Sequence, residues 1–173
     1  MMHADAPTGF FGKLPARGDF LRADLPRSFT DPLDLWLQGV LSASRETFGD
    51  DWGRMWDEAP GWCFALPAGA CGPAPAIGVM LPSRDAVGRG FPLIVARLGA
   101  VSEPDAATFW ALAEVAGRTA IAERLEPDGL RALLREPGAP IASVVQARAP
   151  APWTALPAPA AFAALLEAGA ACP

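Results

Sequence analysis

The stretch Gly9–Phe20, GFFGKLPARGDF, constrains the fold more than any other part of the sequence. Its glycines and prolines allow or impose backbone angles that other residues avoid, so the chain must follow a defined path here. The apolar start of the stretch predicts a short strand over residues 9–14, and a turn over Pro15–Gly18 follows it. We therefore expect a strand that ends in a shaped loop.

Three charged residues, Lys13, Arg17 and Asp19, stand within this loop. Charges held on a shaped loop suit recognition of a charged partner. The alternative is that the phenylalanines pin a terminal strand while the charges simply face water, as most charged side chains do. Spacing alone favours this second interpretation.

A second charged loop has the same composition. It lies between two apolar runs, residues 77–81 and 93–98, which are typical of strands inside a sheet. The loop sets Ser83, Asp85 and Arg89 among glycines and prolines. Because both loops follow or precede a predicted strand, we infer that they meet at one end of the sheet.

The clearest helix is expected to begin with Asp31 as N-cap and Pro32 in the first position, and to stop at Gly49. Apolar residues recur at helical spacing from Phe29 to Phe48, so one face of this helix should lie in the core. The following residues 50–60 predict a short helix or an ordered loop. Trp52, Met55 and Trp56 in it either pack on the long helix, which we favour, or form an exposed docking patch.

The remaining elements alternate between strand and helix. Residues 61–66 and 77–81 predict an antiparallel hairpin. Further along the chain we expect a helix capped by Ser102 and running to about Leu125, a helix over 127–134, an edge strand over 141–145, and a last helical turn or two over 160–168. This order predicts an α/β layered domain with a mixed, largely antiparallel sheet. We expect residues 1–8 to be a flexible N-terminus and residues 9–173 to form a single domain, with a proline- and alanine-rich segment from about residue 149.

Composition and charge exclude several classes of function. With 173 residues and 51% hydrophobic residues the chain can bury a sizeable core, so it is not a disordered chain. A net charge of −5 and a single lysine argue against a nucleic-acid surface, which needs a clustered basic face. No secretion signal and no membrane span are recognisable, so we expect a cytoplasmic protein.

Candidates for catalysis or metal binding are few. The single histidine is His3, and the three cysteines lack the spacing of metal ligands, so no zinc site is expected. A Cys63–Cys71 disulfide is conceivable, but buried free thiols are favoured. A nucleophilic pair of Ser83 and Lys13 is possible if the loops meet, although no oxyanion or triad signature accompanies it.

The two aspartates of the loops allow two interpretations. Asp19 and Asp85 serve acid–base chemistry if they converge. The favoured alternative is that they hold the loops together through ion pairs, Asp19 with Arg89 or Asp85 with Arg17. Lys13, Arg17 and Arg89 would then form a small basic spot suited to carboxylates or phosphates, and recognition of phosphothreonine is one hypothesis.

Three blocks of the sequence, in this order, resemble the TagF family of type VI secretion accessory proteins of Gram-negative bacteria. They are GFFGKLPARGDFLRADLPRSF, GWCFALPAGACG and MLPSRDAVGRGFPL, and the resemblance extends from about residue 8 to about residue 98. The positions that carry it are Gly12, Lys13, Pro15, Arg17, Gly18, Asp19, Phe20, Pro82, Ser83, Asp85, Gly88, Arg89, Phe91 and Pro92.

The resemblance implies a three-layer α/β sandwich and a cytoplasmic protein that represses type VI secretion after translation. It implies contact with the forkhead-associated scaffold protein of the system, a relation to its threonine phosphorylation switch, no catalytic activity and no cofactor. Two other classes remain open. One is a small enzyme or phosphate-ligand binder that uses the two charged loops, and the other is a structural subunit of the secretion machine.

Overall fold

Strands and helices alternate along the chain in the computed structural model, which describes residues 6–135 and 151–170. The first half contains β1 (Thr8–Gly12), β2 (Leu21–Ala23), α1 (Arg27–Phe48), the short 3-10 helix η1 (Gly49–Asp51), α2 (Trp52–Glu58) and β3 (Trp62–Leu66). The second half contains β4 (Ala76–Leu81), β5 (Leu93–Leu98), α3 (Glu103–Ala122), α4 (Pro127–Arg135) and α5 (Pro159–Ala170). The elements predicted over these ranges are therefore present.

The five strands form one sheet in the order β2-β1-β5-β4-β3, and all pairings between these strands are antiparallel. The central strand β5 begins at Leu93, which pairs with Gly12 at the end of β1 and with Leu81 at the end of β4. Because these three positions lie side by side, the loops that follow β1 and β4 must leave the sheet at the same end.

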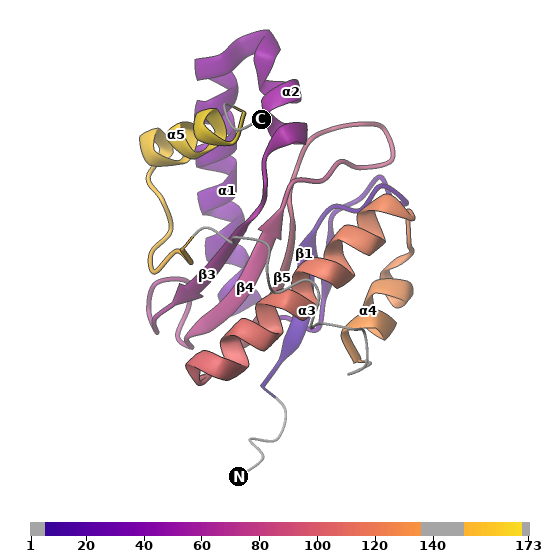
Figure 1. The fold of residues 1–173 in the computed structure, drawn as a ribbon, viewed down its shortest axis with the longest axis vertical. Helices are drawn as coiled ribbons and strands as arrows, with labels where there is room; N and C mark the ends of the chain where they lie inside the picture. The colour runs from indigo at the N-terminus through magenta and orange to yellow at the C-terminus, as the bar shows by residue number, and fades with distance from the viewer. Residues whose placement is uncertain (1–5, 136–150, 171–173) are drawn as a thin grey trace.

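Helices cover both faces of the sheet, which gives the expected three-layer α/β sandwich (Figure 1). On one face, α1, α2 and α5 enclose a core that includes Phe11, Trp56 and Ile94. On the other face, α3 and α4 enclose a second core that includes Phe10 and Phe109. Successive strand residues point to opposite faces, which is why adjacent Phe10 and Phe11 belong to different cores.

The start of α1 differs from the prediction. The helix begins at Arg27 with Pro26 as N-cap, so Asp31 is not the cap and Pro32 lies inside the helix. The Pro26 carbonyl accepts hydrogen bonds from the N–H groups of Phe29 and Thr30, and this earlier start lets both side chains enter the core. Burial of Phe29 thus outweighs the local capping preference. The predicted stop at Gly49 is confirmed, with φ at 53°.

The tryptophans of α2 pack inward. Trp52, Met55 and Trp56 are buried, so the packing interpretation is confirmed and the exposed docking patch is wrong. The Trp52 indole donates to Ser44 on α1 and the Trp56 indole donates to the carbonyl of Ser83. Helix α2 therefore contacts the charged loop that contains Ser83 and helps to hold it in place.

Residues 151–170, here called the C-terminal strap, cross the outer edge of β3 and then form α5 against α1 and α2 (Figure 1). Trp153 makes a parallel bridge to this edge, with the Trp153 N–H bonded to the Cys63 carbonyl and the Ala65 N–H bonded to the Trp153 carbonyl, at 2.9 and 2.7 Å. Its ring stacks on Trp62, and Phe162 packs against both Trp36 and Trp62. Helix α5 is longer than the predicted turn or two, whereas the predicted strand over 141–145 lies outside the described residues.

Candidate functional site

The two charged loops, residues 13–20 and 82–92, are in direct contact, as the sequence predicts. The Lys13 N–H donates to the Pro92 carbonyl at 3.1 Å, and the Ala86 N–H donates to the Arg17 carbonyl at 2.8 Å. Gly12 permits this close approach, because a Cβ atom there would lie 2.0 Å from the Pro92 carbonyl oxygen and its φ is +125°. Any other residue at position 12 would push the loops apart.

Asp85 of the second loop joins the two loops, because its carboxylate binds side chains of both. Its side chain has no exposed surface, and its Oδ2 lies 2.7 Å from Lys13 Nζ and 2.6 Å from Arg89 Nε. Its Oδ1 accepts from the backbone N–H groups of Val87 and Arg89, at 3.0 and 2.9 Å. Both carboxylate oxygens are thus occupied, as a buried charge requires.

The pKa of Asp85 is held well below its usual range. Burial of the carboxylate acts to raise it, but the hydrogen bonds from the Lys13 and Arg89 side chains and from the Arg89 and Val87 N–H groups outweigh that effect. Asp85 is therefore an ionised anchor, which is a structural task and not that of a proton donor.

The ion-pair interpretation of the loops is confirmed in kind, but the predicted partners are wrong. Asp85 pairs with Lys13 and Arg89, whereas Arg17 pairs with Glu126 at 2.6 Å. Asp19 is exposed and takes part in none of the ion pairs formed within residues 6–135 and 151–170. The Arg89 guanidinium instead donates a hydrogen bond to the Gly18 carbonyl of the first loop.

The geometry does not suit a nucleophilic pair of Ser83 and Lys13. The Ser83 hydroxyl donates to the backbone carbonyl of Lys13 at 2.9 Å, while the Lys13 ammonium is bonded to Asp85. An ammonium held by a buried carboxylate is not available as a base. Lys13 is also 8% exposed, so it does not contribute to a basic surface, which leaves Arg17 and Arg89 on the outside.

Phe20 lies over this buried network and remains 56% exposed. Its ring makes an edge contact with Phe91 at 4.7 Å between centroids, and Lys13 Nζ lies 4.8 Å from the Phe20 centroid. Val87, on the second loop, is 72% exposed. Two large apolar side chains are therefore presented to solvent beside two exposed arginines, and of these residue types phenylalanine and arginine are enriched at protein interfaces.

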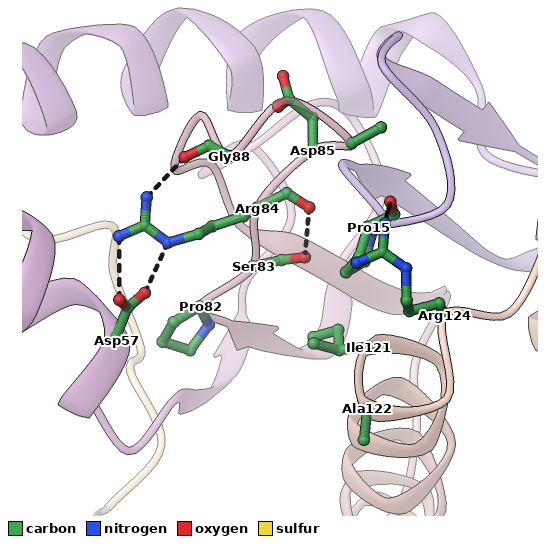
Figure 2. A pocket seen from close by; sticks show the side chains of 11 residues that line it. Pro15, Asp57, Pro82, Ser83, Arg84, Asp85, Gly88, Ile121, Ala122 and Arg124 are labelled. Atoms are coloured by element: carbon green, nitrogen blue, oxygen red, sulfur yellow. Dashed lines mark hydrogen bonds and ion pairs between the residues drawn. The ribbon is translucent and has the colours of Figure 1, made fainter.

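A pocket of about 500 Å³ opens beside the second loop (Figure 2). Arg84 lines one side and forms a two-point ion pair with Asp57, at 2.8 and 3.0 Å, besides donating to the Gly88 carbonyl. Arg124 lines the other side and donates to the Pro15 carbonyl at 2.8 Å. Pro82, Ile121 and Ala122 form the apolar part of the lining.

Sequence reasoning missed Arg124 and Glu126, which belong to the α3–α4 corner, residues 123–126. One signal could have found them. Strand β5 runs away from the loops, so the helix that follows it must return, and a helix of 20 residues spans about 30 Å. The end of α3 was therefore bound to reach the charged loops.

Residues suited to metal binding do not come together in the described part of the chain, where no group of three or more His, Cys, Asp or Glu side chains is found. Cys63 and Cys71 are free and buried, which confirms the prediction of buried thiols. Burial raises the pKa of each thiol to about 11, and Glu114 adds to this for Cys63. Within the described residues, no helix is long and apolar enough to cross a membrane.

Lowering the pH should remove a contribution of Asp85 to stability. The unfolded carboxyl has a pKa of about 3.9, and the folded pKa is lower, so the contribution is complete above about pH 5 and declines as the pH falls below the unfolded value. We expect the difference in unfolding free energy between wild type and Asp85→Asn to shrink below about pH 4. Urea unfolding across this range measures it, and a difference that stays constant would contradict the assignment.

Comparison with known proteins supplies a family. A family model described as the TagF N-terminal domain, type VI secretion system-associated, matches residues 9–135. Among solved structures, the chain is similar to PA0076 from Pseudomonas aeruginosa PAO1, with 31% sequence identity and a TM-score of 0.53. That similarity covers 93% of this chain and 77% of PA0076. A comparison with curated proteins found no match.

Proposed function

Because this chain belongs to the type VI secretion system-associated family that carries the TagF N-terminal domain, we propose that it represses secretion after translation by binding the forkhead-associated scaffold protein of the system. The proposed repressor acts in the cytoplasm, by protein–protein contact and without catalysis, and it is linked to the threonine phosphorylation pathway. The family itself gives the role in type VI secretion. The repressive mechanism and the partner are the proposal.

The observation that carries the proposal is the way in which the loops present Arg17 and Arg89. Their guanidinium groups lie on the outside of two loops that Asp85 holds rigid from within. A rigid surface loses little conformational entropy on binding. Arginine and aromatic side chains are enriched in interfaces, and here two exposed arginines lie beside the exposed ring of Phe20. The engagement of Lys13 and Ser83 in structural contacts supports a role without catalysis.

Removing the exposed positive charges should weaken retention of the scaffold. In the variant Arg17→Glu/Arg89→Gln, glutamine is chosen at position 89 because a glutamate would face the buried Asp85 carboxylate. Truncating an arginine at an interface hot spot costs about 2 kcal/mol or more, so we expect the affinity to fall about tenfold or more. Co-purification of the scaffold with tagged protein from a type VI-positive lysate measures this.

The matched control is Arg27→Glu/Arg135→Gln, which changes the same charges at exposed positions remote from the loops. Circular dichroism should show that all variants fold. If wild type and loop variant retain the scaffold equally, the loops are architectural. If wild type retains none, the proposed partner is wrong.

A second candidate function is favoured by the pocket between Arg84 and Arg124. A pocket of about 500 Å³ with a guanidinium at its side is large enough for a small phosphate-bearing ligand. Titration calorimetry with inorganic phosphate tests this candidate, which predicts binding that does not depend on Arg17.

A further inference from the structure

The pocket beside the second loop has a lining suited to an apolar side chain. Pro15, Pro82, Ile121 and Ala122 contribute apolar surface, and they come from the first loop, the second loop and the end of α3. Figure 2 shows Arg84 and Arg124 on opposite sides of this apolar part. Ala86 of the second loop adds a further apolar side chain to the lining.

The charge left over at this pocket is positive. Two carboxylates line it, and both are already paired, Asp57 with Arg84 and Asp85 with Lys13 and Arg89. Arg124 belongs to none of the ion pairs formed by the part of the chain that the structure describes, and within that part its guanidinium donates to the Pro15 carbonyl alone. A guanidinium has five N–H donors, so most of its donors remain available to an anionic group.

The backbone at Arg124 gives an independent reason to ask what this residue does. Its φ is +53°, and it follows the end of α3, where the Leu125 N–H returns to the Ala120 carbonyl at 2.9 Å. This left-handed position after a helix is the one that glycine fills best, and a side chain there costs stability. An arginine at such a position, with its guanidinium beside a pocket, points to a function of the side chain.

We propose that this pocket is the docking site for an acidic segment of the scaffold protein, which seats an apolar side chain on Pro82, Ile121 and Ala122 and pairs a carboxylate with Arg124. This inference rests on the proposed function, since it places one part of that partner. A protein segment fits this pocket because it can supply both groups at once, an apolar side chain for Pro82, Ile121 and Ala122 and a carboxylate for Arg124.

The variant Arg124→Gly separates function from stability. Glycine relieves the left-handed backbone, so we expect the Tm to rise by about 2–4 °C, the shift that a modest stabilisation gives in a domain of this size. The same variant loses the guanidinium, and its affinity for purified scaffold, measured by calorimetry with the full chain, should fall about tenfold. A second variant, Ala122→Glu, places a competing carboxylate in the pocket and should also weaken binding.

The matched control is Asp24→Gly. Asp24 is the other non-glycine residue with a positive φ within the described ranges, at +62°, and it pairs with Arg131 away from the charged loops. We expect it to leave the affinity for scaffold unchanged. Wild-type affinity in both Arg124→Gly and Ala122→Glu would overturn the docking site while leaving the proposed function standing.

If the wild type does not bind scaffold at all, the proposed function is overturned and the pocket is tested by itself. The labelled full chain is then applied to an array of peptides from the other proteins of the secretion system. Selection of acidic peptides that contain Leu, Ile or Phe, by wild type but not by Arg124→Gly, supports the docking site. Failure to select them, or binding of inorganic phosphate alone that Arg124→Gly abolishes, overturns it.

Discussion

Replacing Asp85 with asparagine should lower the free energy of unfolding by about 3–5 kcal/mol, the usual cost of leaving one partner of a buried ion pair without the other. Asparagine keeps the shape of the side chain and can still accept from the N–H groups of Val87 and Arg89. The loss therefore arises from the Lys13 ammonium, which is 8% exposed and would lack its counter-ion. Urea unfolding followed by circular dichroism measures the change.

The double variant Lys13→Met/Asp85→Asn is the informative control, because it removes both charges and keeps the acceptor for the loop N–H groups. We expect it to regain most of the lost stability, since neutral groups of similar volume commonly replace a buried ion pair at little cost. A double variant as unstable as Asp85→Asn would show that the loss comes from the contacts of the Asp85 carboxylate with Arg89 and the loop N–H groups, and not from the unpaired Lys13 charge.

Replacing Phe162 with alanine should destabilise the fold by about 3–5 kcal/mol, as is usual for a fully buried phenylalanine. Phe162 is 0% exposed and packs between Trp36 of α1 and Trp62 of β3. The residue lies outside the range matched by the family model, so the effect measures how far the C-terminal strap belongs to the core. Thermal unfolding followed by tryptophan fluorescence reports on it directly.

Glu167→Ala is the control for this variant, because Glu167 is on the same helix and exposed. Surface changes of this kind usually alter stability by less than about 0.5 kcal/mol. A loss at Phe162 no larger than that of the control would mean that α5 is attached only loosely. A loss close to the expected value, in one cooperative transition, would mean that the strap unfolds together with the sheet.

The order of strands and helices could be predicted because it depends on patterns local in the sequence. The apolar runs that became β4 and β5, the helix stop at Gly49 and the Ser102 cap of α3 are all read from a few adjacent residues. The start of α1 could not be read in this way. There the burial of Phe29 against residues distant in the sequence decided the outcome.

The contact between the charged loops could be predicted, but the partners within it could not. Register decides the partners, because pairing of Gly12 with Leu93 places Lys13 beside Pro92 and within reach of Asp85. Which basic side chains pair with Asp85 therefore depends on differences of a few ångströms in their positions. The sequence does not reveal such differences. Arg124 required a further step, the return path of α3 across the sheet.

The bridge between Trp153 and β3 has a consequence beyond the packing of α5. The outer strands of an open sheet carry unpaired backbone groups, which can recruit strands from other molecules and start aggregation. Here β2 is three residues long, and at the other margin the strap takes up N–H and C=O groups of β3. The strap thus leaves fewer backbone groups of β3 free to pair with a strand of another molecule, and so protects this edge of the sheet against uncontrolled polymerisation.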